Sequence, residues 1–126
     1  MSRMTRKEMF AGFSFLMDAC IDPEQAYKLE DTSCWDGGNH TELLTLAGLT
    51  LLEGSFVDHK DDPAGYRWME MAVEGHVVFR VLRGESRFVC DIFSHNEFDY
   101  KTVDAFLRER FFVKSASTHW IQRAWS

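Results

Sequence analysis

Residues 66–93 read YRWMEMAVEGHVVFRVLRGESRFVCDIF, and this stretch decides the fold. From residue 66 to 73 the side chains alternate with a period of two, which is typical of a strand with one face toward a core. Residues 76–82 and 86–93 are rich in Val and Phe and predict two further strands. Glu74-Gly75-His76 joins the first pair, and Arg83-Gly84-Glu85 supplies a tight turn for the second. We therefore expect a three-stranded antiparallel meander.

The chain before the meander predicts two strands and two helices. Residues 9–19, MFAGFSFLMDA, favour a central strand, and residues 51–59 favour another. Residues 22–25, DPEQ, are typical of a helix start in which Asp22 caps and Gln25 returns the capping hydrogen bond, and this helix should end near residue 31.

A second capping box, Asn39 with Glu42, precedes an amphipathic helix that we expect to run to about residue 51. Gly48 falls inside that helix and weakens it by about 1 kcal/mol relative to Ala.

After the meander, Asp99 is placed to cap a helix whose apolar residues recur at helical spacing up to Phe111, and residues 113–125 predict a last strand. The order of elements predicts an α+β fold: a mainly antiparallel sheet with two or three helices packed on one face, in a single domain over residues 1–126. Aromatic residues on several strands favour a dimer interface or a ligand cleft on the other face.

Composition excludes several classes of protein. The 126 residues are 45% hydrophobic and include eleven Phe, which suits one compact core. A net charge of −6 argues against nucleic acid and anionic membranes as partners. No apolar run reaches the roughly 18 residues of a membrane span, and no secretory signal is present, so we expect a cytoplasmic protein. The three cysteines, Cys20, Cys34 and Cys90, form no CxxC motif and predict reduced thiols.

Several segments together carry a resemblance to a known family. They are GFSFLMDA, DPAGYRWMEMAVEGHVVFR, FVCDIFS, FDYKTVDAFLRERFF and KSASTHWIQRA. This succession resembles the small prokaryotic and phage-borne S-adenosylmethionine decarboxylases, most specifically at the EGH joint and at DIFS. The resemblance implies that family's fold, S-adenosylmethionine or a related small molecule as ligand, and a homodimer or higher homo-oligomer.

Members of that family carry Glu-Ser-His at the joint, where the serine becomes a pyruvoyl group that acts as the electron sink for decarboxylation. Here Gly75 occupies the position of that serine, so the resemblance implies that no pyruvoyl cofactor forms. The processing histidine falls on Arg80, a processing serine falls near Arg67, and the proton-donating cysteine falls on His95. Glu74 and His76 remain, which leaves Glu74, His76 and His95 as candidate catalytic residues. Arg67, Arg80 and Glu74 are the candidate ligand-binding residues.

Each of these residues also has a simpler interpretation. Gly75 fits a β-bulge or tight bend, and Arg67 and Arg80 fit solvated charges on an edge strand. His59, His76 and His95 have no metal-ligand spacing, so no metal is expected.

Three functions remain open from the sequence. The first is a divergent decarboxylase homologue that binds S-adenosylmethionine or a related metabolite, for example to regulate polyamine synthesis or to pair with an active relative. The second is a phage-type S-adenosylmethionine lyase, whose pocket only orients the sulfonium and excludes water so that methylthioadenosine is released. The third is a non-enzymatic, phage-borne inhibitor that binds a host protein through its acidic surface.

Overall fold

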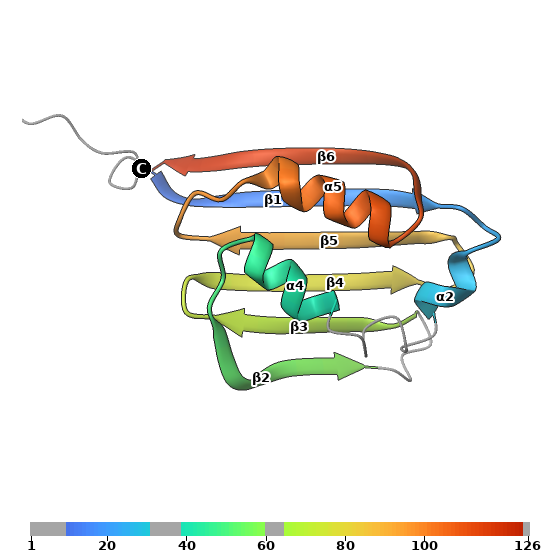
Figure 1. Cartoon of the computed structure of the whole chain (residues 1–126), viewed down its shortest axis with the longest axis horizontal. Helices are drawn as coiled ribbons and strands as arrows, with labels where there is room; N and C mark the ends of the chain where they lie inside the picture. The colour runs from blue at the N-terminus through green and yellow to red at the C-terminus, as the bar shows by residue number, and fades with distance from the viewer. Residues whose placement is uncertain (1–9, 31–38, 60–64, 125–126) are drawn as a thin grey trace, which may run out of the picture.

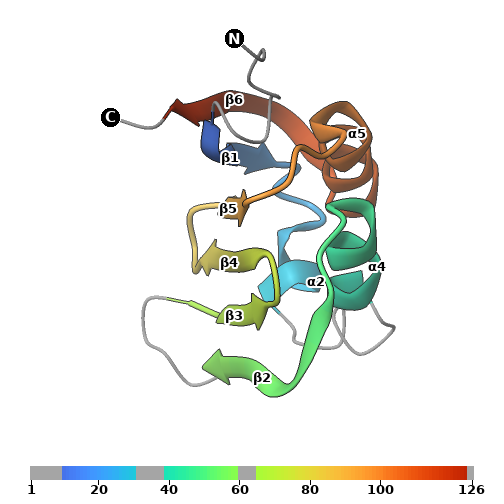
Figure 2. The ribbon, with the colours of Figure 1, turned by 90° about the vertical axis from the view of Figure 1, so that its left-hand side faces the viewer.

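The computed structural model describes residues 10–30, 39–59 and 65–124, and it forms one antiparallel sheet covered by helices on one side (Figures 1 and 2). The six strands lie in the order β2-β3-β4-β5-β1-β6. Their bounds are β1 Phe10–Ile21, β2 Leu51–His59, β3 Arg67–Ala72, β4 Gly75–Leu82, β5 Arg87–Ser94 and β6 Val113–Ala124. This α+β architecture and the β3-β4-β5 meander are the ones that the sequence predicts.

The helices are α2 Ala26–Glu30, α4 Asn39–Leu46 and α5 Tyr100–Arg110. Figure 2 shows α4 and α5 over one face of the sheet, with α2 on the same side at its end. Asp99 caps α5 as expected, because its Oδ1 accepts hydrogen bonds from the backbone N–H groups of Lys101 and Thr102. No helix in the described part of the chain is long and apolar enough to span a membrane.

The predicted capping box at α2 is wrong in one bond. Asp22 Oδ1 accepts from the backbone N–H of Glu24, but the buried Oε1 of Gln25 has no hydrogen-bond partner among the residues that the structure describes. We expected the Gln25 side chain to accept a hydrogen bond from the backbone N–H of Asp22. This N–H donates instead to the carbonyl of Phe112, at 3.0 Å. A contact with a residue ninety positions away therefore replaces the local cap.

The second predicted helix is shorter than expected, because Gly48 ends it. Gly48 has φ +68°, and its N–H donates to the Thr45 carbonyl while the N–H of Leu49 donates to the Leu44 carbonyl. This pair of bonds is a Schellman motif, which satisfies the last carbonyls of α4. Gly48 is thus the terminator of the helix and not a weak point within it. Glu42, expected to cap, accepts a bond from Arg110 on α5 at 3.1 Å.

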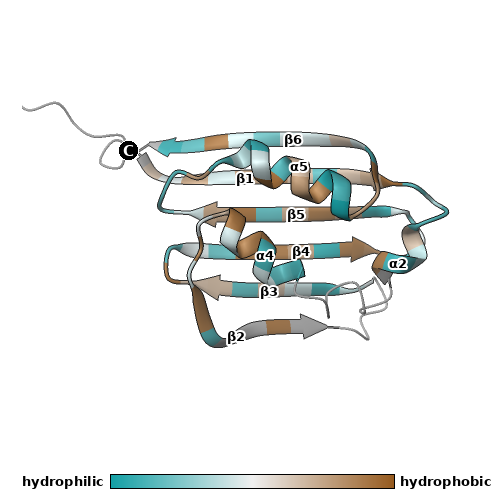
Figure 3. Cartoon of the chain, viewed as in Figure 1, coloured by the Kyte–Doolittle hydropathy of each residue, from teal (hydrophilic) through white to brown (hydrophobic). Residues whose placement is uncertain are grey.

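The core lies between the sheet and the helices. Phe79 on β4 stacks on Trp68 and Phe88 with ring centroids 5.8 and 4.8 Å apart, and it also contacts Phe111 after α5. Along β4 and β5 the burial of the side chains alternates, although both strands are mostly hydrophobic with single hydrophilic residues between, as Figure 3 shows. Cys90 belongs to the buried set, as its alternation with Phe88 and Ile92 predicts.

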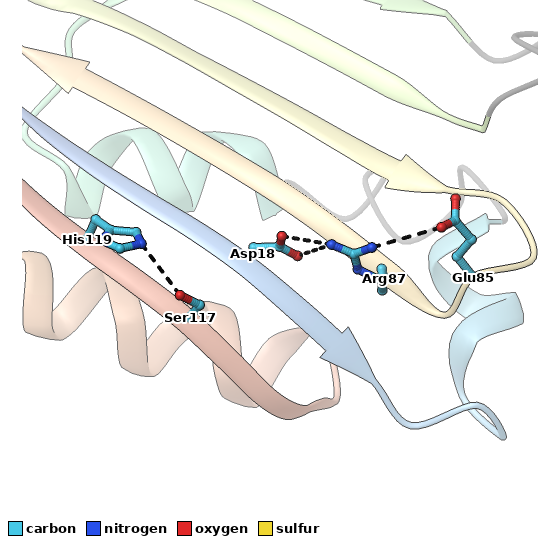
Figure 4. A network of polar contacts seen from close by, with 5 residues as sticks. All are labelled: Asp18, Glu85, Arg87, Ser117 and His119. Carbon is cyan, nitrogen blue, oxygen red and sulfur yellow. Dashed lines mark hydrogen bonds and ion pairs between the residues drawn. The ribbon is translucent and has the colours of Figure 1, made fainter.

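The opposite face carries no helix in the described structure, and we call it the open face. One row of side chains crosses it, and the register of the strands places these residues side by side: Met71, His76, Phe93, Ser14 and Ile121. Farther along, Arg87 makes two bonds to Asp18 at 2.7 and 2.8 Å and lies 3.9 Å from Glu85, while Ser117 and His119 are 3.5 Å apart (Figure 4). The open face is therefore a mixture of exposed apolar groups and paired charges.

Candidate functional site

The joint between β3 and β4 is closed tightly around Gly75. Gly75 is the first residue of β4 and pairs with Ser94 at the end of β5. A Cβ atom built on Gly75 would lie 1.9 Å from the Phe93 carbonyl oxygen and 2.9 Å from Ser94 Cα. These neighbours are backbone atoms of a paired strand, so they do not give way as a flexible side chain would. This backbone has room for glycine and for no larger residue at position 75.

Glu74 is held by Thr50, the residue just before β2. The backbone N–H and the hydroxyl of Thr50 donate to the two carboxylate oxygens of Glu74, each at 2.7 Å. The Val73 N–H also donates to the Thr50 carbonyl at 3.1 Å. The backbone bond from Thr50, followed by its hydroxyl bond, lowers the pKa of Glu74 from the ordinary value of 4.5. Glu74 therefore anchors β2 to the joint as a carboxylate.

His76 and His95 are brought together around Phe93. The His76 ring lies 5.6 Å from the Phe93 ring and the His95 ring lies 5.3 Å from it, between centroids. His95 Nδ1 is 3.1 Å from the Ala11 carbonyl oxygen, which can only accept, so this nitrogen carries the hydrogen. That tautomer leaves Nε2 of the exposed His95 as the basic nitrogen. We call His76, Phe93 and His95 the joint cluster.

The other side of the joint cluster is also enclosed. The Phe93 ring passes over Gly12, where a Cβ would lie 2.4 Å from Phe93 Cε2, and the Arg123 guanidinium lies 5.0 Å from the ring centroid. Beside it the hydroxyl of Ser14 is fully buried and has no hydrogen-bond partner within the described residues. Phe93 thus links β4, β5, β1 and β6 at this end of the open face.

Arg67 and Arg80 lie apart from the joint cluster. They are direct cross-strand partners on β3 and β4, and both line a groove of about 190 Å³ on the open face. Arg80 lies four positions after His76 on β4, a distance of roughly 13 Å along a strand. Neither strand is an edge strand, because β2 lies beyond β3, so the interpretation as edge-strand charges is wrong.

Phe93 and Thr50 are the residues that the sequence interpretation missed. Phe93 carries a signal, since it belongs to the DIFS segment and follows the alternation of β5. Thr50 carries none, because its contact with Glu74 spans 24 positions and depends on where β2 begins. No cluster of three His, Cys, Asp or Glu side chains suited to a metal is found in the described ranges, and the His59 side chain lies outside them.

Known proteins resemble this chain in structure but not detectably in sequence. No family model matches the chain, and no curated protein sequence matches it. Among solved structures, the crystal structure of the adenosylmethionine decarboxylase from Aquifex aeolicus VF5 is similar, with a TM-score of 0.70 and 15% sequence identity over 94% of each chain. The likeness covers nearly the whole described domain. The chain therefore has the S-adenosylmethionine decarboxylase-like fold.

Proposed function

We propose that this chain binds S-adenosylmethionine or a related metabolite and does so without a pyruvoyl group. The observation that carries the proposal is the geometry at Gly75, where the β5 backbone fills the space that a serine side chain would need. Glycine has no oxygen to attack the preceding carbonyl, so the residues at the joint do not fit a self-made pyruvoyl cofactor. The fold is kept while the position for that chemistry is closed.

The joint cluster supports binding of a sulfonium metabolite. The His76 and His95 rings lie 5.6 and 5.3 Å from the Phe93 ring, between centroids. Aromatic faces attract cations, as the Arg123 guanidinium 5.0 Å from the Phe93 ring centroid illustrates, and the net charge of −6 of the whole chain favours a cationic ligand over an anionic one. Met71, exposed beside His76 in the register, adds apolar surface for the rest of the molecule.

The three candidate catalytic residues take different roles in this proposal. Glu74 is a positioning residue, because its carboxylate already accepts two bonds from Thr50 and holds β2 against the joint. His76 and His95 contact the ligand, and Nε2 of His95 is the group that accepts a hydrogen bond from it. Among these side chains no mutual hydrogen bond occurs within the described residues.

The alternatives have weaker support. A lyase that works by orientation needs a pocket that excludes water, whereas the grooves lined by described residues around Asp22 and around Cys20 are broad and open to solvent. An inhibitor of a host protein requires a partner surface that no described feature singles out. Self-association through the open face, with its exposed Val57, Met69 and Ile121, stays a prediction.

The test is titration calorimetry of purified protein with S-adenosylmethionine, S-adenosylhomocysteine and methylthioadenosine, with intact-mass and nucleoside analysis of the same samples. We expect saturable binding, an uncleaved chain near 14.7 kDa and unchanged nucleoside. Absence of binding by all three compounds would refute the proposal. Formation of methylthioadenosine would establish the lyase, and decarboxylated nucleoside would mean that the interpretation of Gly75 is wrong.

A matched pair of variants tests whether the ligand binds at the joint cluster. His76→Gln should weaken binding about tenfold or more, because it removes one ring of the joint cluster. His119→Gln removes an exposed histidine from β6 on the same face, away from the cluster, and should leave affinity unchanged. Equal loss in both variants would place the ligand elsewhere.

A further inference from the structure

Arg123, near the end of β6, lies against the joint cluster. The end of β6, the end of β5 and the joint between β3 and β4 all lie at the same end of the sheet (Figure 1). Arg123 pairs with Gly12 in the β1-β6 register. Because Gly12 has no side chain, the Phe93 ring passes over it, and the Arg123 guanidinium lies over that ring, 5.0 Å from its centroid. A cation from β6 is therefore brought to the group of rings that β4 and β5 form.

The Arg123 guanidinium is positioned by Phe93 but is not neutralised. It is exposed and makes no ion pair or side-chain hydrogen bond with any residue that the structure describes. Arg87, on the same face of the sheet, differs, because Asp18 accepts two of its hydrogen bonds. Contact with an aromatic ring restrains a guanidinium, while its N–H donors remain able to bind an acceptor. Arg123 thus offers positioned donors to a ligand at the joint cluster.

His95 supplies the complementary group next to the same ring. Its Nδ1 hydrogen is directed to the Ala11 carbonyl oxygen, so its Nε2 is an acceptor, and its ring centroid lies 5.3 Å from that of Phe93. The donors of Arg123 and the acceptor of His95 therefore both lie beside Phe93. The amino-acid end of a metabolite carries a carboxylate, which needs donors, and an ammonium group, which needs an acceptor. The two side chains match these two needs.

We infer that Arg123 binds the carboxylate of the ligand and thereby makes the site specific for metabolites with an amino-acid end. This inference rests on the proposed function and names the part of the ligand that is recognised. The parallel N–H donors of a guanidinium match the two oxygens of a carboxylate, and the ammonium group donates to Nε2 of His95. The carboxylate also lies between the guanidinium and the sulfonium, which keeps the two cations apart. Without Arg123, the net charge of −6 would disfavour a carboxylate.

The experiment is titration calorimetry with S-adenosylmethionine and decarboxylated S-adenosylmethionine, two ligands that differ only in the carboxylate. The wild-type protein should bind the first about tenfold or more tightly than the second, the usual effect of a charge-assisted hydrogen bond. Arg123→Gln should lose this preference, because it weakens binding of the first ligand only. Arg123→Lys keeps the charge but not the parallel donors, so its preference should lie between those of the other two proteins.

Lys114→Gln is the matched control. It removes one positive charge from an exposed position of the same strand, nine positions before Arg123 and roughly 30 Å away along β6, and it should keep the wild-type preference. Equal affinities of the wild-type protein for the two ligands, or an unchanged preference in Arg123→Gln, would overturn this inference and leave the proposed function standing. Binding of neither ligand by the wild-type protein would overturn both.

Discussion

Phe79 and Arg80 are neighbours on β4 and lie in opposite environments. Phe79 is fully buried among Trp68, Phe88 and Phe111 on the face that the helices cover. Arg80 is exposed on the open face. One face of the sheet is therefore fixed by packing, while the other is free to carry groups that the fold does not need. This difference teaches where to look for function, since binding groups are tolerated where they are not required for stability.

The largest effect is expected from the covered face. Phe79→Ala should lower the free energy of unfolding by about 3–5 kcal/mol, because it leaves a cavity in the aromatic core. Val78→Ala, one residue earlier on the open face and only half-buried, should cost less than about 1 kcal/mol. Urea denaturation of both variants measures the difference. Equal losses would mean that the open face is packed in solution, as it would be in an oligomer.

The joint should show the next largest effect. Gly75→Ser should cost about 1–3 kcal/mol, the usual range for forcing atoms into a packed structure, since its Cβ meets the Phe93 carbonyl. Gly84→Ser is the matched control: its Cβ meets nothing within 4 Å, so only the φ of +75° opposes it, at about 1 kcal/mol. Thermal denaturation and intact mass are measured together. Self-cleavage of the Gly75→Ser chain would contradict the geometry at the joint.

A smaller effect, in this case a gain of stability, is expected at Ser14, the cross-strand partner of Phe93. Ser14→Ala removes a fully buried hydroxyl that lacks a hydrogen-bond partner among the described residues, and it should raise stability by about 1 kcal/mol. Ser117→Ala, on exposed β6, should change stability by no more than about 0.5 kcal/mol. Chemical denaturation distinguishes them. A marked loss of stability in Ser14→Ala would show that the hydroxyl is bonded in solution.

The smallest expected effect is a change in how the stability of the fold depends on pH, and it comes from Glu74. Because the folded protein lowers the pKa of Glu74, the unfolded chain binds more protons, so this carboxyl stabilises the fold above its ordinary pKa of 4.5. That contribution is lost as pH falls through the folded pKa. Glu74→Gln should therefore flatten the fall in stability between about pH 5 and pH 3, whereas Glu109→Gln on exposed α5 should not. The measurement is the denaturation midpoint of each protein across this pH range. If the midpoints of wild type and Glu74→Gln fall in parallel with pH, the contact between Glu74 and Thr50 does not exist in solution.

Local patterns in the sequence predicted the strands well and the helix ends less well. The meander, the first and last strands and the Asp99 cap are as expected, because alternation and capping are properties of neighbouring residues. The predicted cap of α2 fails because the Phe112 carbonyl accepts the N–H of Asp22, and the predicted end of α4 is wrong because Gly48 terminates the helix with a Schellman motif.

The candidate site was predicted as residues and not as an arrangement. The resemblance pointed to Glu74, Gly75, His76 and His95, and the structure places them at one end of β4 and β5. It also pointed to Arg67 and Arg80, which the register places in a groove of their own. The list of residues contained no information about this division, because cross-strand neighbours depend on register.

By itself, the sequence determined the strands, the approximate positions of the helices and the lack of a side-chain oxygen at Gly75. These follow from periodicity and residue chemistry, which act over a few positions. Only the tertiary structure decided that Phe93 closes over Gly12 and Gly75, that Thr50 holds Glu74, and that Arg80 faces Arg67. Such contacts join residues far apart in the chain, and their geometry exists only once the sheet has formed.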